Sequence, residues 1–79
     1  MTANEYIALY HETDSTKFYD EIRPKLFNGE YDMNGTWYPC IILDDDVGEG
    51  RTHIITRNHT FMTEPNEKVR RTVTNPART

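Results

Sequence analysis

Cysteine is scarce in this chain, and Cys40 is the only one among its 79 residues. A single cysteine excludes an internal disulfide and is typical of proteins in a reducing compartment. Because Cys40 lies between Pro39 and two isoleucines, we expect a buried and unreactive thiol. No apolar run approaches the length of a membrane span, and the residues near Met1 lack the pattern of a signal peptide. We therefore expect a cytoplasmic protein with no membrane partner.

The sequence also lacks the residue arrangements that catalysis requires. Ser15 is the only serine, no Ser-His or Cys-His arrangement is apparent, and no glycine-rich phosphate loop is present. We therefore predict that the protein is not an enzyme and has no cofactor.

Metal-binding patterns are missing as well. His11, His53 and His59 do not show the close pairing that is typical of zinc ligands. The acidic residues 44–46 are followed by Gly48 and Glu49, but the alternating order of a calcium-binding EF-hand loop is missing. We predict a solvated hairpin loop over residues 44–50 and no metal site.

The composition is sufficient for one small domain over residues 1–79. Hydrophobic residues make up 35% of the chain and aromatic residues 11%. A domain of this size has a marginal core, but aromatic side chains each bury a large area and can hold a small barrel together.

Charge is divided unevenly along the chain, whose formal net charge is −4. Residues 1–50 hold 11 of the 13 acidic residues, and residues 51–79 hold six of the nine basic ones. This division produces either a dipolar surface that meets a partner or basic strands that pair with acidic ones. We favour the second interpretation.

The strongest local signal is the pair Asn34-Gly35 between two strand-like runs, which predicts a β-hairpin with a two-residue turn. Pro39 within the second run indicates a bulge or an edge position, since proline cannot donate a ladder hydrogen bond. Alternating and β-branched runs predict strands at residues 30–33, 36–44, 52–56, 60–63 and 68–73.

The N-terminal part, residues 5–29, is expected to hold a strand and one short helix. Residues 6–11 alternate as a strand does, although the start of a helix also fits. N-cap candidates at residues 14–16 precede an expected helix over residues 17–23, whose apolar stripe is Phe18, Ile22 and Leu26. Residues 30–73 form the expected small β-barrel, and residues 74–79 a flexible tail.

Short strands with tight turns and a closing Val-Arg pair describe an SH3-like barrel, and one subgroup fits more closely. Residues 34–42, which read Asn-Gly-Thr-Trp-Tyr-Pro-Cys-Ile-Ile, resemble a segment of Tudor-type domains. Residues 68–71 resemble the last strand of those domains. The resemblance covers roughly residues 30–72 and implies a mainly β, SH3-like fold.

Tudor domains of the methyl-reading kind hold a methylated lysine or arginine in an aromatic cage by cation–π attraction. The resemblance implies that two cage positions fall on Tyr31 and Tyr38. The other two positions fall on Thr56 and His59, which are not aromatic cage residues, and Phe61 is near but out of register. The resemblance therefore implies half of an aromatic cage.

A second resemblance lies at residues 9–13, which read Leu-Tyr-His-Glu-Thr. This segment is similar to the first strand of ADP-ribosyltransferases, with Glu12 in place of a glycine that lets NAD approach the backbone. It implies, as a remote alternative, a nucleotide-binding pocket around His11 and Thr13.

Three functional hypotheses follow, and the first is a protein-interaction module with an aromatic groove and an acidic loop. Such a chain would suit a small phage-encoded or accessory inhibitor of a host protein. Its expected partner-binding residues are Tyr31, Trp37, Tyr38, Asp44, Asp45, Asp46, His59 and Phe61. The second hypothesis is nucleic-acid binding through basic strands, which would use Arg51, Arg57, Lys68, Arg70 and Arg71. The third is the nucleotide pocket around His11.

Overall fold

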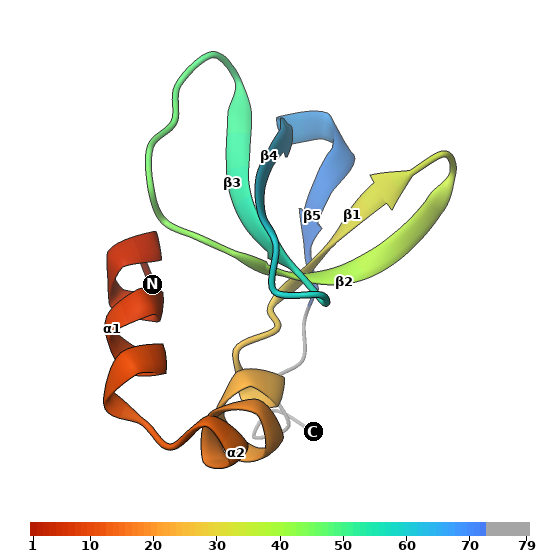
Figure 1. Cartoon of the computed structure of the whole chain (residues 1–79). Coiled ribbons are helices and arrows are strands. Elements are labelled where there is room, and N and C mark those ends of the chain that lie inside the picture. The colour runs from red at the N-terminus through yellow and green to blue at the C-terminus, as the bar shows by residue number, and fades with distance from the viewer. Residues whose placement is uncertain (73–79) are drawn as a thin grey trace.

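The computed structural model of the chain describes residues 1–72 and consists of a helical N-terminal part followed by a β-sheet (Figure 1). The helical elements are α1 (Ala3–Glu12), α2 (Ser15–Lys17), the π-helical turn η1 (Phe18–Ile22), and the 3-10 turns η2 (Arg23–Lys25) and η3 (Asn66–Lys68). The strands are β1 (Gly29–Met33), β2 (Thr36–Ile42), β3 (Arg51–Thr56), β4 (Phe61–Pro65) and β5 (Val69–Arg71). The predicted tail, residues 74–79, and the predicted last strand residue Val73 lie outside the described residues.

The five strands form one antiparallel sheet in the order β4-β3-β2-β1-β5. Each begins within one residue of its predicted position, so the mainly β fold class is confirmed. The predicted hairpin turn is confirmed too, because Asn34 and Gly35 have φ angles of 54° and 90°. Strand β5 returns to pair with β1, so that the first and last strands are neighbours. This arrangement is compatible with a small β-barrel.

The inner face of the sheet encloses a hydrophobic cluster to which all five strands contribute. Its buried members are Tyr31, Cys40, Ile42 and Ile54, with Met62 and Val69 packed against them. Because side chains from both edge strands reach one cluster, the sheet is strongly curved around it. The predicted burial of Cys40 is confirmed, since the residue is fully buried and burial raises the pKa of its thiol to about 11.

Gly29 of β1 is paired with β2 on one side and with β5 on the other. A Cβ atom at this position would overlap with the side chain of Ile42 and lie 2.7 Å from the backbone oxygen of Arg70. Only glycine leaves room for this close approach of backbone and side chain.

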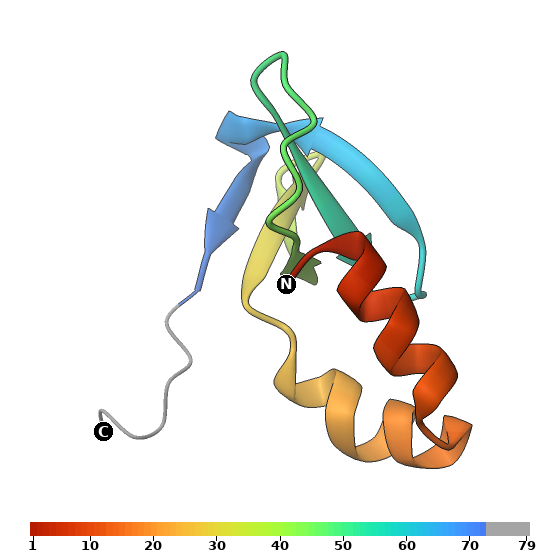
Figure 2. The same ribbon diagram turned by 90° about the vertical axis from the view of Figure 1, so that its left-hand side faces the viewer.

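The outer face of the sheet is covered by the N-terminal helices. Figure 2 shows α1 beside the sheet, with the second helical segment crossing below it. The outer cluster consists of the buried residues Tyr6, Phe18, Ile41, Leu43 and Ile55. Neighbouring residues of β2 therefore belong to different clusters: Ile41 packs in the outer cluster with the helices, and Ile42 packs in the inner cluster.

The predicted strand at residues 6–11 is wrong, because these residues belong to helix α1. The helix begins with a capping box, in which the side chain of Thr2 accepts from the Glu5 N–H and the Glu5 carboxylate accepts from the Thr2 N–H. This reciprocal pair satisfies two N–H groups that have no partner within the helix, and it favours helix over strand.

The predicted short helix is present and extends further than expected. Asp14 caps it as predicted, and the chain stays helical from Ser15 to Lys25 through α2, η1 and η2. Its apolar stripe is confirmed, because Phe18 is fully buried and both Ile22 and Leu26 pack against the outer cluster. Within the described residues, no helix is long and apolar enough to cross a membrane.

We predict that Thr2→Ala lowers the free energy of unfolding by about 1 kcal/mol, because it removes the N-cap of α1. The matched control is Thr16→Ala, which removes an exposed threonine whose side chain caps no helix. Urea unfolding followed by circular dichroism measures both changes. Equal stability of the two variants would contradict the role of the capping box.

Candidate functional site

The residues predicted to bind a partner lie in separate places on the molecule. Tyr31 and Tyr38 face each other across the β1–β2 pair, with ring centroids 6.0 Å apart. Trp37 lies beside them in β2 but points to the opposite face of the strand, as alternation requires. His59 and Phe61 pack against the helices, on the outer side of the sheet. The predicted single groove is therefore wrong: among its aromatic residues in the described part of the chain, Tyr31 and Tyr38 share a cavity, and Trp37 and Phe61 do not line it.

That cavity, here called the aromatic pocket, has a volume of about 300 Å³ and is open to solvent. It is lined by Tyr31, Met33, Tyr38, Pro39, Thr56, Arg57 and Asn58. Tyr31 is buried and forms the floor, and its burial raises the pKa of its hydroxyl. Met33 and Tyr38 are 46% and 42% exposed, so apolar surface is available for contact at the rim.

A second cavity, here called the arginine pocket, adjoins the aromatic pocket on the helical side of β2. It has a volume of about 380 Å³ and is lined by Tyr19, Arg23, Pro24, Phe27, Pro39 and Arg57. Pro39 and Arg57 line both pockets, so the two cavities meet at these residues. The sequence reasoning missed this pocket, because it arises only where the helical segment packs on the sheet.

Both pockets carry positive charge that no carboxylate of residues 1–72 neutralises. Arg57 is exposed, and among the described residues it makes no ion pair. Arg23 is only 8% exposed, and in the same part of the chain its guanidinium contacts a hydroxyl and a carbonyl but no acid. An anionic group entering here would meet two cations.

A buried hydrogen-bond network fixes Arg23 at the base of the arginine pocket. Its Nε donates to the hydroxyl of Tyr6 at 3.0 Å, and its terminal nitrogen donates to the carbonyl oxygen of Thr56 at 2.5 Å. The Tyr6 hydroxyl also lies 2.9 Å from Nδ1 of His59. The network therefore connects α1, the second helical segment and the β3–β4 turn.

His59, at one end of this network, is surrounded by aromatic rings. Its ring lies 5.2 to 5.7 Å from the rings of Tyr6, Tyr10 and Tyr19. Burial, together with the positive charge of Arg23, lowers the pKa of the imidazole. In the Nε2–H tautomer of a neutral imidazole, Nδ1 accepts a hydrogen bond, and in that tautomer the Tyr6 hydroxyl donates to His59 while it accepts from Arg23.

The acidic residues 44–46, which were expected to attract a partner, make contacts within the chain. Asp44 binds the N-terminal ammonium at 2.5 Å, and this hydrogen bond lowers the pKa of its carboxyl group. Asp45 accepts from the N–H of Ala3 and lies 3.2 Å from Nδ1 of His53. Asp46 accepts from the N–H of Gly48. Asp44 and Asp45 therefore hold the start of the chain and of α1 against the β2–β3 loop.

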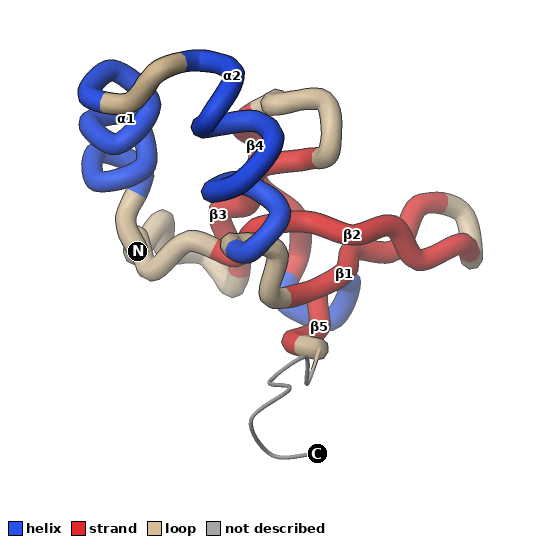
Figure 3. The backbone as a smooth tube through the Cα atoms, turned by 90° about the horizontal axis from the view of Figure 1, so that it is seen from below, coloured by secondary structure: helices blue, strands red, loops and turns tan. Residues whose placement is uncertain are grey.

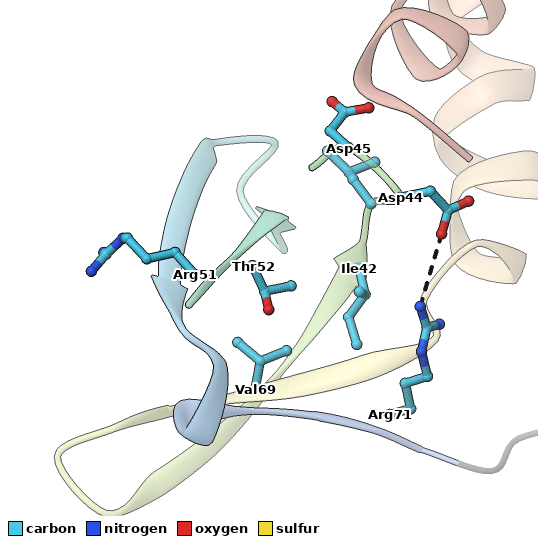
Figure 4. Close-up of a pocket in the computed structure, with 8 residues that line it drawn as sticks. Ile42, Asp44, Asp45, Arg51, Thr52, Val69 and Arg71 are labelled. Atoms are coloured by element: carbon cyan, nitrogen blue, oxygen red, sulfur yellow. Dashed lines mark ion pairs between the residues drawn. The ribbon is translucent and has the colours of Figure 1, made fainter. Parts of the chain in front are cut away.

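A third cavity, of about 380 Å³, lies between this loop and β5 (Figure 4). Asp44 and Arg71 form an ion pair at its rim, with 3.8 Å between their charged atoms. The side chain of Arg51 points away from the cavity in Figure 4 and donates instead to Thr63. The charged groups around this cavity thus have partners within the chain.

The basic residues expected to bind nucleic acid do not form one continuous face. Arg70 donates twice to Glu30, at 2.7 and 3.0 Å, and its guanidinium lies 4.0 Å from the centre of the Trp37 ring. Arg51 and Arg57 lie at opposite ends of β3, and Lys68 is exposed in η3. The favoured interpretation of the charge asymmetry is confirmed at Glu30–Arg70 and Asp44–Arg71, where acidic and basic residues pair.

The remote nucleotide-pocket hypothesis depended on a first strand at residues 9–13, and this strand is wrong. His11 lies in the last turn of α1, and Thr13 is its C-cap. Neither residue lines any of the three cavities described above.

Metal-ligating side chains are dispersed. Within residues 1–72, no group of three or more His, Cys, Asp and Glu side chains is placed to hold a metal ion.

Comparison of the chain with models of protein families, with curated proteins and with solved structures gives no match.

We predict that Tyr6→Phe lowers the free energy of unfolding by about 1–3 kcal/mol, because Arg23 Nε loses its buried acceptor. The matched control is Tyr38→Phe, which removes a hydroxyl from an exposed side chain. Chemical unfolding of both variants measures the difference. If Tyr6→Phe lowers the free energy of unfolding no more than Tyr38→Phe does, the hydrogen bond from Arg23 to Tyr6 does not stabilise the fold as predicted.

We also predict a pH dependence of stability that comes from His59. Its pKa is lower in the folded protein, so the unfolded chain binds a proton first as the pH falls below about 6.5, and stability decreases there. His59→Asn, which suits the φ of 65° at this position, should flatten the decrease. The matched control is His11→Asn, at an exposed histidine. Unfolding measured between pH 7.5 and 5.5 tests this, and equal flattening in both variants would contradict it.

Proposed function

We propose that this chain is a non-enzymatic protein-interaction module built on an SH3-like, Tudor-resembling small barrel. Three features support the SH3-like assignment: β5 pairs beside β1, a 3-10 turn precedes β5, and all five strands share one inner cluster. The segment that carries the Tudor resemblance, residues 34–42, forms the hairpin turn and strand β2.

The observation that carries the proposal is the meeting of the aromatic and arginine pockets at Arg57. Exposed apolar side chains beside an exposed cation without an ion pair within residues 1–72 are typical of a recognition surface. Aromatic and arginine side chains are the residue types enriched in binding hot spots. The two pockets present these residue types on the two faces of β2, and they meet at Pro39 and Arg57.

The charge of the site selects the partner. A methylated lysine in the aromatic pocket would meet the Tyr31 and Tyr38 rings but also the cation of Arg57. Like charges in a partly desolvated pocket repel each other, so a cationic ligand is disfavoured. The module therefore binds a protein segment that is apolar and neutral or acidic, which differs from the ligand of a methyl-reading cage.

We predict that protein capture depends on both pockets. Immobilised chain should retain from cell lysate a protein partner that survives nuclease treatment. Tyr38→Ala and Arg57→Glu should each reduce its recovery by about tenfold or more, as expected for loss of a hot-spot residue. The matched control is Val47→Ala, which removes an exposed apolar side chain from the β2–β3 loop and should leave recovery unchanged.

The same measurement distinguishes protein binding from nucleic-acid binding. Recovery of nucleic acid that disappears at high salt and is unaffected by Tyr38→Ala would contradict the proposed protein-interaction role. A partner retained equally by wild type, Tyr38→Ala and Arg57→Glu would place the contact elsewhere and would also contradict the proposal.

A further inference from the structure

Strand β2 has an open edge along its first half. β1 pairs with β2 from Thr36 to Cys40, whereas β3 pairs with it only from Cys40 to Ile42. Within residues 1–72, the segment 36–39 therefore has a strand on one side only. Figures 1 and 3 show this part of the hairpin projecting away from the rest of the sheet.

The backbone groups on this edge follow from the register of the sheet. The N–H of Leu43 donates to the carbonyl oxygen of His53, so odd-numbered residues of β2 direct their backbone groups towards the β3 side. Trp37 therefore presents a donor and an acceptor at the open edge. Pro39 presents its carbonyl oxygen alone, because proline has no N–H.

We propose that an extended acidic–apolar peptide segment of a partner protein binds here by adding a strand to the open edge of β2. The inference rests on the proposed function and specifies its ligand and its mode of binding. In strand addition, main-chain hydrogen bonds supply affinity, and pockets for alternate side chains supply specificity. The added strand occupies the position that β3 leaves empty beside residues 36–39.

The two pockets lie where the side chains of such a strand would point. The aromatic pocket belongs to the inner face, since its floor is Tyr31 of the inner cluster. The arginine pocket lies on the helical side, since Phe27 and Tyr19 line it. Successive side chains of a strand point to opposite faces, so neighbouring ligand residues enter different pockets.

The chemistry of each pocket defines the side chain that it takes. An apolar or aromatic side chain fits between Met33, Tyr31 and Tyr38 in the aromatic pocket. An aspartate or glutamate fits the arginine pocket, where Arg23 and Arg57 lack carboxylate partners among the described residues. The peptide therefore carries an apolar residue next to an acidic one.

The test uses the full chain and a displayed library of random linear peptides, with selection against the wild-type protein and counter-selection against Tyr38→Ala. We expect the enriched peptides to contain an apolar residue adjacent to an acidic residue. A synthetic peptide of the enriched sequence is then measured by calorimetry against wild type, Arg57→Glu and the control Val47→Ala. Arg57→Glu should weaken binding by about tenfold or more, and Val47→Ala should not.

Strand addition itself is tested by replacing the peptide's backbone amides with esters, one at a time. Each replacement removes one N–H donor and keeps the side chain. An ester at a position whose N–H faces β2 should weaken the affinity of the peptide by about three- to tenfold. An ester at the positions between them should leave the affinity unchanged. This alternation is the signature of a strand and is not expected for a helix or an irregular loop.

The possible failures are distinguishable. Peptides that depend on Tyr38 but show no alternation on ester replacement would overturn strand addition and leave the proposed function intact. Enriched peptides without an acidic residue, bound equally by Arg57→Glu, would overturn the assigned ligand chemistry. Absence of any peptide that depends on Tyr38 or Arg57 would overturn both the inference and the proposed function.

Discussion

The structure depends on the fact that the second half of strand β2 is buried on both of its faces. Ile41 and Leu43 are covered by the helices, while Cys40 and Ile42 belong to the inner cluster. A strand buried on both sides reads as a continuous apolar run, and residues 40–43 are such a run. The two clusters are consequently joined through one strand, and a marginal core of this size holds both layers together.

The first half of the same strand is free on one edge, and the candidate site is located there. The helical segment does not cover this part of β2 completely, and β3 turns away at Thr56. Arg23 then anchors that turn from below through the carbonyl of Thr56 and the hydroxyl of Tyr6. The pockets are therefore positioned by the rigid core although they lie at its margin.

Much of the sheet could be predicted from the sequence, because Asn34-Gly35 fixes the register that brings Tyr31 opposite Tyr38. Helix α1 could not be assigned from periodicity, since Tyr6 and Tyr10 lie four residues apart and share a face in either a strand or a helix. The Thr2–Glu5 capping box was the signal that would have decided it. The arginine pocket could not be predicted from local sequence patterns, because Arg23 and Arg57 come together only through tertiary packing.

Pro39 has a consequence for the solubility of the protein. An open strand edge is a template on which further copies of a chain can stack, and a regular ladder of donors and acceptors promotes that growth. Pro39 interrupts the row of hydrogen-bonding groups on this edge after Trp37. Its carbonyl oxygen can accept one hydrogen bond, but without an N–H it cannot form the two-bond pair of a regular antiparallel ladder. The edge can thus accept a short extended segment while opposing the continuous pairing on which fibril growth depends.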